Sequence, residues 1–277
     1  MQMNAAEELE RRRGADRRDR ADAAVAAGLV AAIEGGEIEV LFQPQYAAAN
    51  GALVGAEALA RWRHPGLGEI GATDLFALAE RAHRVSQVSR HIARTALASA
   101  ARWPAPLRLS LNVTASDLAA PDFAEAMAEL LAASGFAPDR LTVEITEQSL
   151  VTELESPARQ LRRLAELGIH VALDDFGAGF CNFRYLQRLP LHALKLDRSL
   201  IEGIGESRRD LAVLRGIVAM AEALGLEVIA EGIETEAQRE AVAAEGCTAW
   251  QGFLGAEPMS AAAFAALSRR EARDCDR

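Results

Sequence analysis

Eight short runs of aliphatic and β-branched residues, separated by segments with helical signals, constrain the fold of this chain more than any other feature. Runs such as VALDD and LTVEIT lack the three-to-four spacing of an amphipathic helix, so they indicate buried strands. The predicted strands lie near residues 40–43, 53–58, 107–112, 141–145, 170–174, 193–196, 227–230 and 249–253.

The segments between these runs carry the start and stop signals of helices. A serine and a proline at 156–157 open one helix, and Gly168 stands where that helix should end. Residues 211–225 and 235–246 repeat the pattern, each with a glycine after the last turn. A strand, a capped helix and another strand are typical of parallel strands with crossover connections. Eight such strands predict an α/β fold of the closed, TIM-type (β/α)8 class, with an open doubly wound sheet as the alternative.

The 277 residues fit either one large barrel or two smaller domains. We expect a helical lead-in or linker over residues 1–36, a barrel domain over 37–270 and a short tail over 271–277. The lead-in carries a basic run at 11–20 beside a thin apolar stripe, which favours a solvated helix over a segment that faces a partner or a membrane.

Charge and cysteine content exclude several classes of protein. A net charge of −10 argues against binding to nucleic acid polymers, although metal ions could still supply local positive charge for a phosphate substrate. The three cysteines are too few for a disulfide framework or a thiolate zinc site. No apolar stretch approaches the roughly 20 residues of a membrane helix, and the first residues contain no signal-like apolar segment. The expected location is the cytoplasm.

Six of the apolar runs end on a carboxylate or an amide. Their terminal residues are Glu57, Asn112, Glu144, the pair Asp174 and Asp175, Asp197, and Glu231. In a (β/α)8 barrel the C-terminal ends of the strands form the active site, so most of these side chains should share one mouth. Carboxylates gathered in this way repel one another and raise each other's pKa values. Divalent cations would remove that conflict.

The types of these residues indicate which metal the site would hold. Every candidate ligand is an oxygen donor and no histidine stands at a strand end, so Mg²⁺ or Mn²⁺ suits the site better than Zn²⁺. The adjacent Asp174 and Asp175 could serve two cations, as in two-metal phosphoester hydrolysis. Lys195, at the end of its strand, is predicted to orient the attacking water, with a buried structural ion pair as the alternative.

Seven motifs follow one another along the chain. They are EALAR at 57–61, LNVT at 111–114, VEITE at 143–147, DDFGAGF at 174–180, LKLD at 194–197, AEGIET at 230–235 and QGF at 251–253. In this order they resemble the motif set of the EAL-domain cyclic di-GMP phosphodiesterases, from about residue 38 to residue 259. The resemblance implies a barrel whose first strand is antiparallel to the others, and hydrolysis of cyclic di-GMP to linear pGpG.

The resemblance also implies the roles of single residues. One metal would be held by Glu57, Asn112, Glu144 and Asp174, and the second by Asp174, Asp175 and Glu231. Lys195 would contact the attacking water, with Glu231 as its base. The substrate would meet Gln43, Arg61, Gln251, Pro258 and Asp197, the last of which could instead lie behind the metal ligands. Glu147, Gly177 and Gly179 would support a loop at 174–186 that couples the second metal to a homodimer contact.

The sequence departs from the family pattern in two places. Cys181-Asn182 stand where a pair of serines is common, and Ala178 replaces a frequent threonine. The stretch LGAEPMS lacks the aromatic and basic residues often seen before Pro258. Two alternatives to an active enzyme therefore stay open, a catalytically silent sensor that binds cyclic di-GMP and a protein-interaction scaffold. The complete set of predicted ligands favours the enzyme.

Overall fold

A computed structural model describes residues 27–147, 155–179, 183–204 and 207–275 of the chain. By the density of its backbone contacts the chain divides into two compact units. The first comprises Met1–Glu39 and Ala60–Ile92, and the second comprises Val40–Leu59 and Ala93–Arg277. Strands β1 and β2 and helix α3 each run from one unit into the other.

The first unit is small. It contains a helix at 27–35, β3 (Gly68–Gly71), α2 (Ala72–Arg81) and the last part of β2, which pairs antiparallel with β3. Leu29 and Ala32 are fully buried, so this end of the predicted lead-in is packed. The indole Nε1 of Trp62 donates a hydrogen bond to a carboxylate oxygen of Glu37 at 3.1 Å. The rest of the lead-in, residues 1–26, lies outside the described residues.

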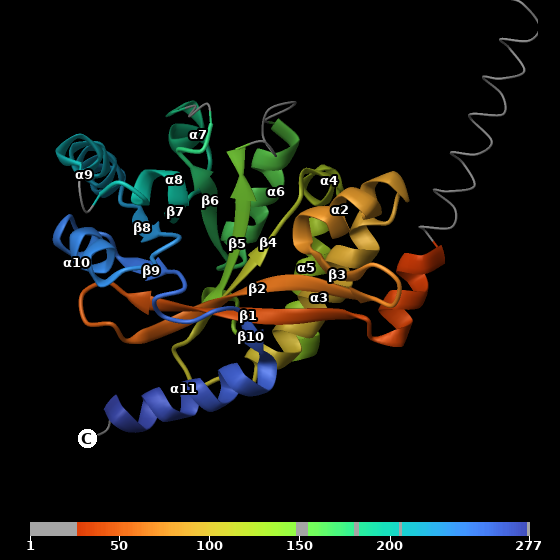
Figure 1. Cartoon of the computed structure of the whole chain (residues 1–277). Coiled ribbons are helices and arrows are strands. Elements are labelled where there is room, and N and C mark those ends of the chain that lie inside the picture. Colours follow the sequence, from red (N-terminus) through yellow and green to blue (C-terminus); the bar gives the residue numbers. More distant parts are fainter. Residues whose placement is uncertain (1–26, 148–154, 180–182, 205–206, 276–277) are drawn as a thin grey trace, which may run out of the picture. The chain divides into compact units, whose positions relative to one another are not determined.

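The second unit holds a closed barrel of eight strands (Figure 1). The strands are β1 (Ile38–Ala47), β2 (Leu53–His64), β4 (Arg108–Asn112), β5 (Leu141–Thr146), β6 (His170–Phe176), β7 (Ala193–Leu196), β8 (Glu227–Ala230) and β9 (Ala249–Gln251). Neighbours from β2 through β9 pair in parallel, β1 pairs antiparallel with β9, and a β1–β2 pairing closes the ring. The eight predicted strands, the barrel and the inverted first strand are confirmed. A two-residue strand, β10 (Met259–Ser260), adds to β1 and was not predicted.

The helices of this unit connect successive strands, except α11, which follows the last strand. Their bounds are α3 (Val85–Ala100), α4 (Ala115–Ala119), α5 (Phe123–Ser134), the 3-10 turn η1 (Pro138–Arg140), α6 (Glu155–Glu166), α7 (Phe183–Arg188), α8 (Arg198–Ile201), α9 (Arg208–Ala223), α10 (Glu236–Ala244) and α11 (Ala261–Cys275). Helix α11 continues past residue 270, where the tail was predicted to begin. Within the described ranges every helix is too short or too polar to span a bilayer.

Local sequence explains why these elements form. All four residues of β7 and the first five of β5 are buried, as expected for barrel strands covered on both faces. Thr235 caps α10 through a capping box with Gln238. Gly168 and Gly246 follow α6 and α10 with φ values of +88° and +94°, a conformation that glycine adopts at little cost. These local signals determine where each helix and strand begins and ends. They therefore also determine which residues lie at the mouth of the barrel.

Candidate active site

Lys195 lies at the centre of the strand-end carboxylates. It comes from β7, and its side chain is 1% exposed. Its ammonium Nζ lies 2.6 Å from Glu144, 2.7 Å from Glu231, 3.2 Å from Asp174 and 3.4 Å from Glu57, measured to a carboxylate oxygen in each case. Carboxylates from β2, β5 and β6 and from just after β8 therefore meet around one cation from β7, as the barrel topology predicts.

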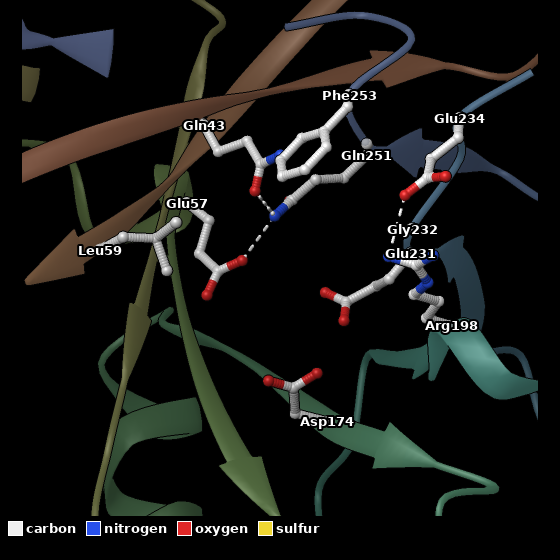
Figure 2. Close-up of a pocket in the computed structure, with 11 residues that line it drawn as sticks. Gln43, Glu57, Leu59, Asp174, Arg198, Glu231, Gly232, Glu234, Gln251 and Phe253 are labelled. Carbon is white, nitrogen blue, oxygen red and sulfur yellow. Dashed lines mark hydrogen bonds and ion pairs between the residues drawn. The ribbon is translucent and has the colours of Figure 1, made fainter. Parts of the chain in front are cut away.

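Glu57 is the most completely bonded of these carboxylates. Its Oε1 accepts a hydrogen bond from Asn112 Nδ2 at 2.7 Å, and its Oε2 accepts one from Gln251 Nε2 at 2.7 Å. The Gln251 amide also donates to Gln43 Oε1 at 2.9 Å. Figure 2 shows Gln251 reaching between Gln43 and Glu57, with the carboxylates of Glu57, Asp174 and Glu231 turned toward a common space. Two neutral amides thus fix the orientation of Glu57.

The charges of this cluster shift the pKa values of its members in opposite directions. Burial raises the pKa of Glu144 well above its usual range and that of Glu231 to about 8, although Lys195 counteracts both shifts. Burial also acts to raise the pKa of Glu57, but Lys195 and the hydrogen bonds from Gln251 and Asn112 bring it below its ordinary value. Burial alone would lower the pKa of Lys195, yet the four carboxylates raise it well above its usual range. Even with one ammonium among them, Glu144 and Glu231 thus keep raised pKa values.

A pocket of about 280 Å³ opens above this cluster within the second unit. Its lining residues are Gln43, Glu57, Leu59, Asp174, Arg198, Glu231, Gly232, Glu234, Gln251, Gly252 and Phe253. Acidic oxygens and amides form one part of the lining, whereas Phe253, 59% exposed, presents an aromatic ring at the pocket (Figure 2). The pocket combines a polar floor with an apolar contact, as small-molecule sites commonly do.

The described residues fit divalent cations by their chemistry. No group of three or more described His, Cys, Asp or Glu side chains is arranged as a ready metal site, because the carboxylates close on the Lys195 ammonium instead. The donors are nevertheless all oxygens, and Glu144 Oε1 is buried without a hydrogen-bond partner among the described residues. Buried carboxylate oxygens are normally satisfied, so an excess of acidic oxygens, one of them without a partner, suits a hard divalent cation.

Asp174 and Asp175 occupy a bulge in β6. The pairing register of β6 with β7 shifts between Leu173 and Phe176, and Asp175 has a left-handed backbone with φ of +56°. Bulges re-aim side chains next to active sites, and a left-handed non-glycine residue is uncommon. Asp174 joins the Lys195 cluster, whereas Asp175 is exposed and does not line the pocket. Partial desolvation of its carboxyl group, followed by the neighbouring Asp174, raises the pKa of Asp175.

Four other predicted site residues are not among the residues that line the pocket. Arg61 belongs to the first unit, where it donates to the Ala60 carbonyl and pairs with Glu69 at 3.6 Å. Asp197 caps α8 by accepting from the backbone N–H of Ser199 at 3.0 Å. Pro258 precedes β10 and is partly buried. Glu147 is buried just after β5. The predicted roles of these residues stay predictions.

The two predicted loop glycines differ in their structural need. Gly177 has φ of +99°, and a side chain there would collide with Leu200. Gly179 has open space around it and no left-handed backbone. The departures at Cys181 and Asn182 lie outside the described residues.

Sequence reasoning missed several residues of the site. Arg198 and Glu234 line the pocket and form an ion pair at 2.8 Å (Figure 2). Gln45 donates its amide to Gln251 Oε1 at 3.0 Å. The available signals were weak: Gln45 stands two residues after Gln43 and so shares its strand face, and Arg198 directly follows the LKLD motif.

Comparison with known proteins agrees with the barrel fold. The model of the EAL domain family matches residues 26–258. The fold is a barrel with one inverted strand, and its mouth carries a polar, acidic site. The chain belongs to the EAL domain family.

Individual relatives include both characterised and uncharacterised proteins. A cyclic di-GMP phosphodiesterase of Pseudomonas aeruginosa is 37% identical over 223 residues, covering 79% of this chain and 38% of the relative. An uncharacterised signalling protein of Caulobacter vibrioides is 36% identical over 222 residues, covering 80% of this chain and 27% of the relative. The chain thus spans less than half the length of either relative.

Among solved structures, the phosphodiesterase PaMucR in complex with c-di-GMP superposes with a TM-score of 0.80 at 32% identity. The likeness covers 87% of this chain and 99% of that structure.

Proposed function

We propose that this chain is a metal-dependent phosphodiesterase that hydrolyses cyclic di-GMP to linear pGpG. The observation that carries the proposal is the convergence of Glu57, Glu144, Asp174 and Glu231 on Lys195, with Asn112 bonded to Glu57. Relatives named cyclic di-GMP phosphodiesterases, and a related phosphodiesterase solved with c-di-GMP, support the choice of substrate. Such a reaction would end a bacterial second-messenger signal.

Two divalent cations, Mg²⁺ or Mn²⁺, are proposed as cofactors. Glu57, Asn112, Glu144 and Asp174 would hold one, and Asp174, Asp175 and Glu231 would hold the other. When bound, the cations supply a water of lowered pKa and neutralise charge on the phosphate. The donation from Asn112 Nδ2 to Glu57 leaves the Asn112 carbonyl as its metal-binding atom.

The remaining chemistry is assigned to residues of the chain itself. The buried Lys195 ammonium orients the attacking water through its N–H donors. Glu231, which lines the pocket and lies 2.7 Å from the Lys195 ammonium, is assigned to accept the proton of that water. Gln43 and Gln251, which line the pocket, would bind the dinucleotide, together with Arg61, Asp197 and Pro258.

Turnover is the direct test of this proposal. Purified protein with Mg²⁺ or Mn²⁺ is expected to convert cyclic di-GMP to pGpG, followed by chromatography, and chelation of the metal should abolish the product. Calorimetry on the same samples measures binding. Tight binding with no linear product under either metal would identify a sensor, and neither binding nor product would leave a protein-interaction scaffold.

A homodimer is the proposed assembly, with α7 in the contact. Phe183, the first residue of α7, is 59% exposed, so its ring is available for a contact with a second copy of the chain. Sedimentation at micromolar concentration should give a dimer for the native chain and a monomer for Phe183→Glu, while Leu67→Glu, a change at another exposed apolar residue, should remain dimeric. A native monomer would refute this assembly. The cytoplasmic location and the division at residues 36 and 270 stay predictions.

A further inference from the structure

A chain of buried glutamine amides connects β1 to the site. Gln43, Gln45 and Gln251 are each less than one tenth exposed. Gln43 and Gln45 are two residues apart on β1, so their side chains share the inner face of the strand. Gln45 lies directly opposite Gln251 in the antiparallel register of β1 and β9. The inverted first strand is what sets these residues side by side.

The hydrogen bonds of this chain have one direction. Gln45 Nε2 donates to Gln251 Oε1 at 3.0 Å, which uses the carbonyl of Gln251. The two N–H groups of Gln251 are then directed to Gln43 Oε1 at 2.9 Å and Glu57 Oε2 at 2.7 Å. A primary amide has two donors on one side and a carbonyl on the other, so each bond constrains the others.

The opposite orientation of Gln251 would be unfavourable at both ends. A flipped amide would bring its carbonyl oxygen against the Glu57 carboxylate and its N–H groups against the donor of Gln45. Acceptors facing acceptors and donors facing donors, all buried, would leave polar groups unsatisfied. Glu57, which as a carboxylate can only accept, therefore selects this orientation, and Gln45 completes it by donating to the Gln251 carbonyl.

We infer that Gln45 is a positioning residue: by donating to Gln251 Oε1, it holds the Gln251 amide in the orientation that serves Gln43 and the dinucleotide pocket. Gln251 and Gln43 line the pocket, whereas Gln45 is not among its lining residues. The role in catalysis rests on the proposed function. The orientation of the amide rests on the hydrogen bonds alone.

The first test is the Michaelis kinetics of Gln45 variants. Gln45→Glu replaces the donor by an acceptor of similar shape, and it is expected to raise KM for cyclic di-GMP about 10-fold or more with a smaller change in kcat. Gln45→Lys restores a donor to Gln251 Oε1 and should recover most of the loss. If Gln45→Glu and Gln45→Lys have equal KM values, the donor has no role and the inference is wrong.

A double-mutant cycle separates positioning from general structural damage. Gln45→Met should raise KM in the native chain but have no further effect in a Gln251→Met background, because it acts through Gln251. Equal effects in both backgrounds would overturn the inference. Gln160→Met is the matched control: Gln160 is as buried, bonds to Pro121 and Ala124, and lies outside the pocket lining, so KM should stay unchanged.

A spectroscopic readout does not depend on turnover. The side-chain amide signals of Gln251, assigned by their loss in Gln251→Met, should shift strongly in Gln45→Glu and remain in place in Gln160→Met. An unshifted Gln251 signal in Gln45→Glu would contradict the orientation. If the native protein fails to cleave cyclic di-GMP, the proposed function fails, while this measurement still decides whether Gln45 orients Gln251.

Discussion

Asp174→Asn is expected to lower kcat by on the order of 10³-fold while the barrel stays folded. Asp174 is the one residue proposed to serve both cations, and its carboxylate lies 3.2 Å from Lys195 Nζ. An amide keeps the shape of the carboxylate but not its charge, so affinity for both metals should fall. Glu57→Ala also removes the carboxylate that accepts hydrogen bonds from Asn112 and Gln251, and it should lower kcat by a similar factor.

These variants should lose activity without unfolding. The cluster has four carboxylates around one ammonium, so removing one buried negative charge relieves repulsion. Steady-state turnover, metal titration and thermal denaturation of the same preparations separate the two effects. Asp139→Asn, which makes the same chemical change at an exposed residue of η1, serves as the control and should behave as the native protein. Retained turnover in Asp174→Asn would refute the metal assignment.

Lys195→Met is expected to have the largest effect on stability. Removing one partner of a buried ion pair typically costs about 3–5 kcal/mol, because an uncompensated buried charge remains. Here the lost ammonium neutralises four carboxylates, so unfolding by denaturant should need much less denaturant in the variant near neutral pH. Saturating Mg²⁺ should stabilise the variant more than the native chain, because the cation then supplies the missing positive charge.

The pH dependence of this loss has a definite sign. Without the lysine, the buried carboxylates should have pKa values above those of the native fold, where that of Glu231 is already about 8. A carboxylate with a raised folded pKa stabilises the fold below its unfolded pKa and loses that contribution as the pH rises through the folded pKa. The loss of folding stability caused by Lys195→Met should therefore become smaller as the pH falls from about 8 toward 4.5.

An exposed ion pair provides the control for this variant. Arg215 pairs with Glu245 at 2.7 Å, and its side chain is 66% exposed. Arg215→Met should lower stability far less than Lys195→Met, because solvent screens the exposed Arg215 charge. If Lys195→Met is no less stable than Arg215→Met, the buried cluster does not depend on its lysine.

The strands could be predicted because their signals are local. Buried aliphatic runs such as that of β7, and glycine stops such as Gly246, act over a few residues, and eight such units in series permit few topologies. The strands that escaped prediction, β3 and β10, are the four- and two-residue additions at the sheet edges, too short to have a pattern. The inversion of β1 has no signal of its own and came from the motif resemblance.

Within the site, the sequence predicted which acidic residues come together, but not which residues they would bond to. Glu57, Glu144, Asp174 and Glu231 were expected to converge, since barrel strands end at one mouth. Nothing in the sequence indicated that Lys195 would pair with all four, nor that Arg198 and Glu234 would line the pocket.

The sequence by itself therefore determined the eight strands of the barrel, the class of barrel and the oxygen-rich character of the site, because hydrophobic periodicity and the residues that follow each apolar run are local features of short segments. The tertiary structure alone decided which side chains form hydrogen bonds and ion pairs with one another. Gln45 and Gln251 are 206 positions apart, and Lys195 and Glu57 are 138 apart. Such pairs form only when the ring closes, since closure brings β1 antiparallel against β9 and places one ammonium among four carboxylates.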